Sequence, residues 1–197
     1  RIVVLDDPED RRRTLALVMD ELDRMQRIVN DLIILAKSEQ PDFLDLDTVD
    51  VGKLTEDVHA KAEAIAPRDW RLERKGRGIV VADRQRLTQA LMQLAQNAAQ
   101  HTERGAVIGL GSAVTNGEAR LWVVDSGPGI PPDQRAKVFR RFARGGGARP
   151  SEGAGIGLAI VKAIAEAHHG RVELDSSLGR GSTFTVVIPT DQPEEPR

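Results

Sequence analysis

The sequence predicts an α/β domain preceded by one long α-helix, on the strength of three patterns. Apolar residues recur at helical spacing through about the first forty of the 197 residues. Short strand-like runs then alternate with helical runs. Two pairs of strand-like runs are separated by turn sequences, Asn116-Gly117 and Leu178-Gly179-Arg180-Gly181, which predict two β-hairpins.

The N-terminal segment carries an unbroken heptad pattern. Asp7 suits the N-cap position of a helix, and Pro8 suits its first turn. Apolar residues then alternate at spacings of three and four: Leu15, Val18, Leu22, Met25, Val29, Leu32 and Ala36. Further apolar residues widen this seam, as in a helical bundle: Leu17, Ile28, Ile33 and Leu35. Two interpretations stay open, a seam that packs against a partner helix or a helix that packs on its own globular domain.

The remainder of the chain divides into a linker, a folded domain and a tail. Pro41 and the acidic stretch up to Asp50 predict a linker. The domain is expected to contain, in order, a helix over 51–66, strands over 70–73 and 79–82, a helix capped by Asp83, a hairpin of 106–115 with 119–125, a helix over 155–168, and a hairpin of 171–176 with 183–188. We therefore expect parts at 1–42, 43–190 and 191–197, the last a disordered polar tail.

Composition excludes several classes of protein. Lys and Arg number 28 against 30 Asp and Glu, a net charge of −2 that argues against a basic nucleic-acid binder. There is no Cys, which excludes disulfides, thiolate zinc sites and cysteine nucleophiles. No apolar run approaches the roughly 20 residues that span a bilayer, and no secretory signal opens the chain. We therefore expect a cytoplasmic location.

Two segments carry polar residues suited to a nucleotide. Asn97 lies on an Ala-rich helix, where its carbonyl oxygen suits Mg²⁺ or, alternatively, an ordinary hydrogen bond. Asp125 ends a hydrophobic strand and precedes Gly127 and Gly129, which let a ligand approach the backbone closely. Its carboxylate suits an exocyclic amine such as that of adenine. The alternative is a Pro-Gly turn in which Asp125 binds its own backbone.

A third segment, Gly153-Ala154-Gly155-Ile156-Gly157-Leu158, opens a helix. Glycines there expose backbone N–H groups at the positive end of the helix dipole, which suits phosphate oxygens. No hydrophobic strand runs directly into the segment, so it is not a dinucleotide-binding fingerprint. A basic cluster precedes it, Arg135, Lys137, Arg140, Arg141, Arg144 and Arg149 against Asp133 and Glu152. The cluster predicts either a phosphate contact or a solvated charged surface.

In this order and spacing the three segments resemble the ATP-binding domain shared by sensor histidine kinases, gyrase-type topoisomerases, Hsp90 chaperones and mismatch-repair ATPases. Asn97 matches the N box, residues 125–129 the first glycine box and residues 153–158 the second. Residues 138–144 resemble the F box of histidine kinases, and 181–184 resemble the closing glycine-Thr-Phe segment. The heptad helix resembles the second helix of the dimerisation and phosphotransfer hairpin, which we assign to 1–42. The resemblance covers roughly residues 8 to 189.

The resemblance implies a two-layer sandwich, a mixed β-sheet under three helices, with ATP beneath a lid at 131–152. Asp125 would bind adenine, Asn97 would hold Mg²⁺, with Gln93 as a second candidate, and Arg144 would contact phosphate. The remaining ATP contacts that the resemblance implies are Gly127, Gly129, Ile130, Phe142, Gly153, Gly155, Ile156, Gly157, Leu158 and Thr183.

The sequence departs from the histidine-kinase pattern at three points. Gln93 stands where many histidine kinases carry Asn, which puts the metal coordination in doubt, and Gln100 stands where Lys is frequent. No H box is present, because the four histidines, His59, His101, His168 and His169, all lie outside the heptad helix. The accepting histidine is therefore expected outside this chain.

The function implied by the resemblance is that of the catalytic part of a two-component sensor histidine kinase. It would transfer the γ-phosphate of ATP to that external histidine, for relay to a response regulator. The full-length protein is expected to be a homodimer through its helical bundle and anchored in the plasma membrane. Two alternatives stay open: a small ATPase or protein Ser/Thr kinase of the same superfamily, or a regulatory nucleotide-binding module without transfer activity.

Overall fold

The structure is a computed structural model that describes residues 8–142 and 155–191. Its helices are α1 (Pro8–Lys37), α2 (Val51–Ala62), α3 (Arg84–Gln100), α4 (Pro132–Arg135) and α5 (Gly157–Ala167). Its strands are β1 (Asp47–Asp50), β2 (Asp69–Arg74), β3 (Ile79–Ala82), β4 (Val107–Thr115), β5 (Glu118–Asp125), β6 (Arg171–Ser177) and β7 (Gly181–Pro189).

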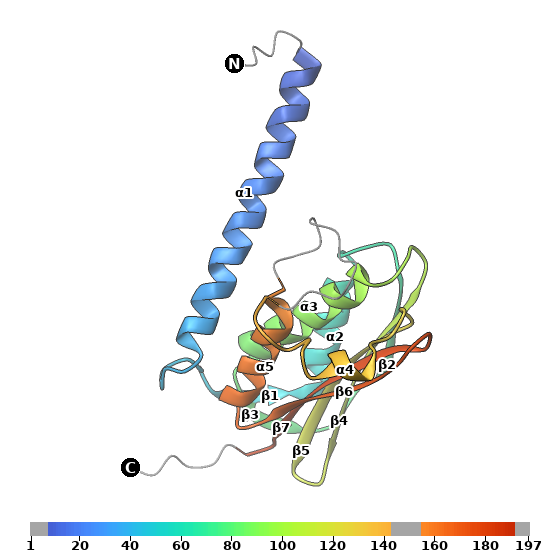
Figure 1. The fold of residues 1–197 in the computed structure, drawn as a ribbon. Coiled ribbons are helices and arrows are strands. Elements are labelled where there is room, and N and C mark those ends of the chain that lie inside the picture. The colour runs from blue at the N-terminus through green and yellow to red at the C-terminus, as the bar shows by residue number, and fades with distance from the viewer. Residues whose placement is uncertain (1–7, 143–154, 192–197) are drawn as a thin grey trace.

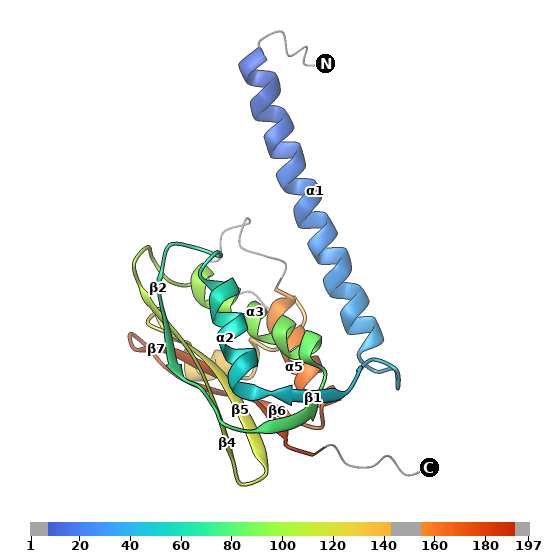
Figure 2. The same cartoon turned by 180° about the vertical axis from the view of Figure 1, so that it is seen from behind.

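The domain is a sandwich of two layers (Figures 1 and 2). Five strands form one sheet in the order β2-β4-β5-β7-β6. Only the β2-β4 pair is parallel, so the sheet is mixed. The helices α2, α3 and α5 lie over one face of this sheet, with the apolar core between the layers. The predicted sandwich of a mixed sheet and three helices, preceded by a long helix, is confirmed.

Local sequence signals explain several of these elements. The turn between β4 and β5 has positive φ at both Asn116 (54°) and Gly117 (76°), as a two-residue hairpin turn requires. Along β5 the side chains alternate between buried and half-buried, so one face of the strand meets the core. The carboxylate of Asp83 accepts a hydrogen bond from the backbone N–H of Arg86 and caps α3, as predicted.

The predicted linker is wrong over its last four residues, Asp47–Asp50. These residues form β1, which pairs with β3 in a separate two-stranded antiparallel sheet. Val49 is buried, whereas Asp47 and Asp50 are exposed, so the acidic side chains that suggested a linker occupy the outer positions of a strand. The pairing joins segments about thirty residues apart, which no local pattern reveals. The helix expected over 51–66 also ends earlier, at Ala62.

The connection between α1 and the domain is fixed by side chains at the start of α3. The backbone N–H of Asp45 donates to the Asp83 carboxylate over 3.0 Å. The guanidinium of Arg86 lies 4.4 Å from the ring centre of Phe43, which is itself buried. Asp83 therefore caps α3 and holds the incoming chain with the same carboxylate.

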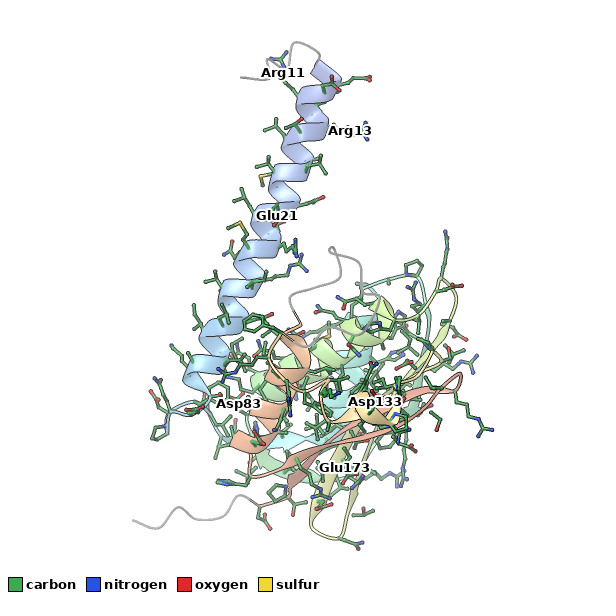
Figure 3. The ribbon with its side chains drawn as sticks, in the orientation of Figure 1. Arg11, Arg13, Glu21, Asp83, Asp133 and Glu173 are labelled. Carbon is green, nitrogen blue, oxygen red and sulfur yellow. The ribbon has the colours of Figure 1, made fainter. Side chains whose placement is uncertain are left out.

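Helix α1 extends away from the domain over most of its length (Figure 3), where Arg11, Arg13 and Glu21 project from its outer part. Leu35 is buried and Ile28 and Ile34 are partly buried, so its C-terminal part packs on the domain, against α5. The heptad seam is exposed, with side-chain exposures from 41% at Leu32 to 63% at Leu15. The helix thus packs on its own domain with one face and presents the seam on another.

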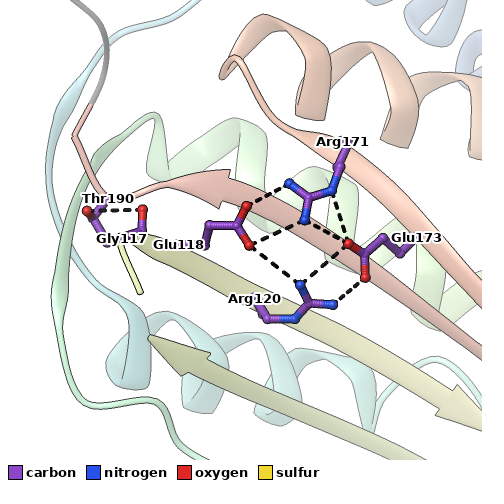
Figure 4. A network of polar contacts seen from close by, with 6 residues as sticks. All are labelled: Gly117, Glu118, Arg120, Arg171, Glu173 and Thr190. Carbon is purple, nitrogen blue, oxygen red and sulfur yellow. Dashed lines mark hydrogen bonds and ion pairs between the residues drawn. The ribbon is translucent and has the colours of Figure 1, made fainter. Parts of the chain in front are cut away.

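The sheet face opposite the helices carries a network of ion pairs (Figure 4). Arg171 on β6 contacts Glu118 on β5 over 2.7 Å and also contacts Glu173. Arg120 forms ion pairs with both carboxylates, and its guanidinium also donates a hydrogen bond to Glu173. The hydrogen bond from Arg171 lowers the pKa of Glu118, and that from Arg120 lowers the pKa of Glu173. The network links β5 to β6 across the intervening strand β7.

Within the described ranges, no helix combines the length and apolar character needed to cross a membrane.

Candidate nucleotide site

Helix α3 presents the two amide side chains of the candidate site. Gln93 and Asn97 lie four residues apart, on one face of the helix, and both are half-buried. The side-chain oxygen of Gln93 lies 2.6 Å from the point that a Cβ at Gly157 would occupy. A side chain at position 157 would therefore displace Gln93. The glycine lets the start of α5 approach α3, and the two helices pack together.

The start of α5 supplies backbone donors. Gly155 has a positive φ of 69°, which brings the chain into the helix, and the buried Ile156 is the N-cap residue. Isoleucine has no side-chain oxygen, so it cannot satisfy the N–H groups of the first turn. These N–H groups lie at the positive end of the helix, next to Gln93. Leu158, another predicted contact, is half-buried in this first turn.

Asp125 lies at the end of β5 and is only 7% exposed. Its Oδ1 accepts a hydrogen bond of 2.8 Å from the backbone N–H of Gly127, and the backbone N–H of Ser182 also donates to the carboxylate. Burial raises the pKa of Asp125 above 3.8, although these two donors and the nearby His101 oppose the rise. Among the described residues its hydrogen-bond donors are backbone groups, and a buried carboxylate of this kind suits a ligand that brings a further N–H group.

The loop after Asp125 fits closely between α3 and the turn that joins β6 to β7. A Cβ at Gly127 would lie 2.7 Å from the carbonyl oxygen of His101, at the end of α3. Gly129, with a φ of 74°, leaves no room for a Cβ beside the carbonyl of Ser177. The backbone N–H of Gly179 donates to the carbonyl of Pro128 over 2.8 Å. Both glycines are needed for close packing of this loop, in addition to any approach of a ligand.

The structure brings together most of the predicted site residues that it describes. Gln93 and Asn97 lie on the C-terminal half of α3, the start of α5 packs beside Gln93, and the glycine loop that follows Asp125 packs against the end of α3. Arg144 and Gly153 lie outside the described residues, as do residues 143–152 of the expected lid. Within that segment the structure describes the short helix α4.

Two predicted contacts have a different placement from the rest. Thr183 pairs with Val124, whereas Ser182 pairs with Asp125. Because directly paired residues share a sheet face and successive residues alternate, Thr183 lies on the face opposite Asp125, and Ser182 lies on the same face.

Phe142 is 63% exposed. Its neighbour in the F box, Phe139, instead packs edge-on against Phe184 at 6.1 Å.

Two polar residues at this end of the sheet were missed by the sequence analysis, Ser176 and Ser182. The hydroxyls of the two serines lie 3.0 Å apart, and the Ser176 hydroxyl accepts from the backbone N–H of Ile130 over 2.8 Å. Both serines are buried. Alternation along β6 and β7 could have placed them on the core face, but nothing local distinguishes a serine that contacts a distant loop from an ordinary strand residue.

The fold and this arrangement define a nucleotide-binding domain of the α/β sandwich type. Residues 82–192 match the family described as histidine kinase-, DNA gyrase B-, and HSP90-like ATPase, and the chain belongs to this family. Its fold is that of the ATP-binding catalytic domain of histidine kinases.

Named relatives support the same conclusion. The chain is 35% identical over 190 residues to the probable sensor histidine kinase TcrY of Mycobacterium tuberculosis. The matched region covers 94% of this chain and 40% of TcrY. The structure of full-length ShkA in complex with AMPPNP superposes with a TM-score of 0.80 at 28% identity, over 95% of this chain and 40% of ShkA. Histidine kinase ThkA in complex with the response regulator TrrA gives 0.75 at 25% identity, over 97% of this chain and 55% of ThkA. The chain thus spans about two fifths of the length of TcrY.

Proposed function

We propose that this chain binds Mg²⁺-ATP and donates its γ-phosphoryl group to a histidine on an acceptor helix outside the chain. The observation that carries the proposal is the grouping of Asp125, the amides of α3 and the N-terminus of α5 around the C-terminal half of α3. ShkA, which has the same fold, was solved with AMPPNP, an analogue of ATP. ATP is therefore the ligand that the site and its relatives favour together.

Each part of the site has a distinct task in this proposal. The carboxylate of Asp125 accepts a hydrogen bond from the exocyclic amine of adenine and so selects the base. The N–H groups at the start of α5 receive phosphate oxygens. Arg144 is the proposed cationic contact to the phosphates. Phosphoryl transfer needs mainly positioning and neutralisation of the developing charge, and these residues supply both.

The amides of α3 fit a magnesium ion that is shared with phosphate. Among the described residues, no group of three or more His, Asp or Glu side chains could hold a metal ion by itself. Mg²⁺ at nucleotide sites commonly keeps several waters and takes one or two protein oxygens together with phosphate oxygens. We propose Asn97 as the protein ligand, with Gln93 as a second, and the ion would neutralise phosphate charge.

The proposed partners follow from the relatives. ThkA was solved with a response regulator, which supports relay of the phosphoryl group from the acceptor histidine to such a protein. We further propose that 1–42 contribute to a dimerisation hairpin, that 43–190 form the catalytic domain, and that the longer protein is a homodimer. A cytoplasmic domain of a membrane-anchored sensor is the setting in which ATP and a response regulator are both available.

Calorimetric titration with Mg²⁺-ATP tests the binding step. The parent chain should bind, and Asp125→Asn should weaken binding about tenfold or more, because an amide cannot replace a carboxylate that accepts from two backbone donors and adenine. Asp175→Asn is the matched control, since Asp175 is an exposed carboxyl on β6, and it should change affinity less than twofold. Equal affinity of both variants for Mg²⁺-ATP, or no binding by the parent chain, would contradict the proposal.

A further inference from the structure

The hydroxyl of Ser176 joins three separate segments at the base of the candidate site. It accepts a hydrogen bond of 2.8 Å from the backbone N–H of Ile130, at the end of the loop that follows β5. It donates to the carbonyl of Gly181, at the start of β7, over 3.0 Å. The hydroxyl of Ser182 lies 3.0 Å away. Ser176 is only 3% exposed, so water cannot readily replace these partners.

These contacts use the full capacity of the Ser176 hydroxyl. A hydroxyl has one proton to donate and two lone pairs to accept with. Its proton is used for Gly181, and its lone pairs receive Ile130 N–H and Ser182 O–H. Because Ser182 must then be the donor of the serine pair, the direction of each hydrogen bond in the cluster is defined. A fully satisfied buried group of this kind holds its partners in one arrangement.

The cluster connects both ends of the loop that contains the glycines. The backbone N–H of Ser182 donates to the carboxylate of Asp125, where the loop begins. Ser176 holds Ile130, where the loop ends. A Cβ at Gly181 would overlap the carbonyl of Asp125, so the strands approach as closely as the backbone allows. The position of Asp125 relative to Ile130 is therefore determined through the two serines.

Arg135 adds a second connection from the far side of the loop. Its guanidinium donates to the carbonyl of Ser176, and its Nε donates to the carbonyl of Ile130 over 3.4 Å. Arg135 ends α4, the first helix of the segment that follows the loop. The start of this segment is thereby held to the same residue, Ser176, that holds the loop.

We propose that Ser176 is a positioning residue for adenine recognition, acting through Ser182 on Asp125 and through Ile130 on the loop, with Arg135 as its support. Ser176 itself need not contact the nucleotide, and Arg135, a member of the basic cluster, acts here through its hydrogen bonds to Ser176 and Ile130. The inference rests on the proposed binding of adenine at Asp125. It goes beyond that function in assigning base selectivity to a buried hydroxyl on a different strand.

Selectivity between bases distinguishes positioning from general stability. Guanine carries an oxygen where adenine carries its exocyclic amine, so a well-placed Asp125 carboxylate should favour ATP over GTP. In Ser176→Ala the loop loses its anchor, and we expect about tenfold weaker ATP binding. GTP, which gains little from Asp125, should bind within about twofold of the parent value. The ATP/GTP ratio of dissociation constants, measured by calorimetry on the full chain, should therefore shift about tenfold towards unity.

Two further variants complete the experiment. Ser112→Ala is the matched control, because Ser112 is fully buried on β4, where it is hydrogen-bonded to the Thr55 hydroxyl and accepts from the backbone N–H of Gly76, away from the loop. It should lower the melting temperature and leave the ATP/GTP ratio unchanged. Arg135→Gln alters a half-buried side chain and leaves the core intact, and it should shift the ratio in the same direction as Ser176→Ala by about threefold.

The outcomes separate the two proposals. A parent chain that binds neither nucleotide, or binds ATP and GTP equally, overturns adenine recognition at Asp125 itself. If the parent chain prefers ATP to GTP and Ser176→Ala leaves the ATP/GTP ratio unchanged, the proposed role of Ser176 is wrong. If Ser176→Ala does not fold, Arg135→Gln tests the inference instead, and an unchanged ATP/GTP ratio in that folded variant overturns it. A fall in ATP and GTP affinity by the same factor assigns Ser176 a structural role only and also contradicts it.

Discussion

At Asp125, burial and hydrogen bonding act in opposite directions on the ionised carboxyl group. Burial is the largest effect and raises its pKa above 3.8, so the charged form is less favourable in the folded chain than in the unfolded one. A carboxyl whose pKa rises on folding binds its proton more tightly when folded. Its contribution to stability therefore decreases as the pH rises through the folded pKa. At pH 7 the charge at Asp125 destabilises the fold.

This balance predicts that Asp125→Asn separates stability from binding. The substitution removes the buried charge and keeps an oxygen that can accept from Gly127. We expect a melting temperature at pH 7 no lower than that of the parent, together with the loss of ATP affinity described above. Thermal unfolding followed by circular dichroism, without nucleotide, measures the first part. A clear drop in melting temperature would show that the carboxylate is a net structural contributor.

The amide side chain of Gln93 predicts slow hydrolysis of ATP. Its side chain lies beside the start of α5, at the phosphate end of the proposed site, but an amide cannot take a proton from water at neutral pH. We expect the isolated chain to hydrolyse ATP very slowly, and Gln93→Ala to leave that low rate nearly unchanged. A coupled assay for released phosphate provides the measurement. A rate typical of dedicated ATPases that Gln93→Ala abolishes would favour the ATPase alternative over the kinase.

At the scale of elements, His168 links the end of α5 to the start of α3. It is fully buried; its Nε2 accepts from the backbone N–H of Asp83 over 3.0 Å, and its Nδ1 lies 2.8 Å from the carbonyl of Ile164. The ring must therefore be neutral, with its proton on Nδ1. Burial is the main cause that lowers its pKa below 6.5; the contacts with Ile164 and Asp83 oppose this effect, and His169 reinforces it.

The neutral state of His168 predicts a pH dependence of folding. Below pH 6.5 the unfolded chain takes up a proton at this histidine and the folded chain does not, so stability falls as the pH decreases towards the folded pKa. We expect His168→Gln to be less stable at pH 7 but to lose less further stability between pH 7 and pH 5. His169→Gln, at the exposed neighbouring position, should change the slope far less, because His169 is the smallest of the causes that shift the pKa of His168. Urea unfolding at several pH values compares the three chains.

The elements that could be predicted from the sequence are those whose signals are local. The Asn116-Gly117 hairpin and the Asp83 cap each depend on a few adjacent residues, and both were predicted at the observed positions. Strand β1 and the parallel pairing of β2 with β4 depend on distant partners, so no pattern indicated them. The site divides in the same way: Asp125 and Asn97 lie in recognisable motifs, whereas Ser176 acquires its role only through contacts with Ile130 and Ser182.

At the scale of the whole molecule, the proposed nucleotide site and the heptad seam lie on separate parts. Helix α1 packs on α5 near its C-terminal end and then extends away from the domain (Figure 1). Helix α5 begins at the proposed phosphate site, and His168 is the C-cap residue at its other end. Leu15, Leu22 and Val29 on the seam are each more than half exposed. An apolar stripe of this length suits a second helix of the same pattern, such as the partner helix of a dimerisation hairpin.

The separation of seam and site predicts how transfer should depend on α1. Incubated alone with γ-labelled ATP, the chain should form no acid-labile phosphohistidine, because His168 is buried and His59, His101 and His169 all lie outside the seam. Mixed with a polypeptide whose acceptor helix carries a histidine, it should label that histidine, since docking on the seam raises the effective concentration of bound ATP near the acceptor.

Leu22→Asp should impair this labelling at least tenfold and leave ATP affinity within twofold. Asn30→Asp, which adds the same charge at an exposed position off the seam, should transfer at nearly the parent rate. Strong self-labelling at His59 or His101, or an undiminished rate in Leu22→Asp, would show that the seam does not dock the acceptor.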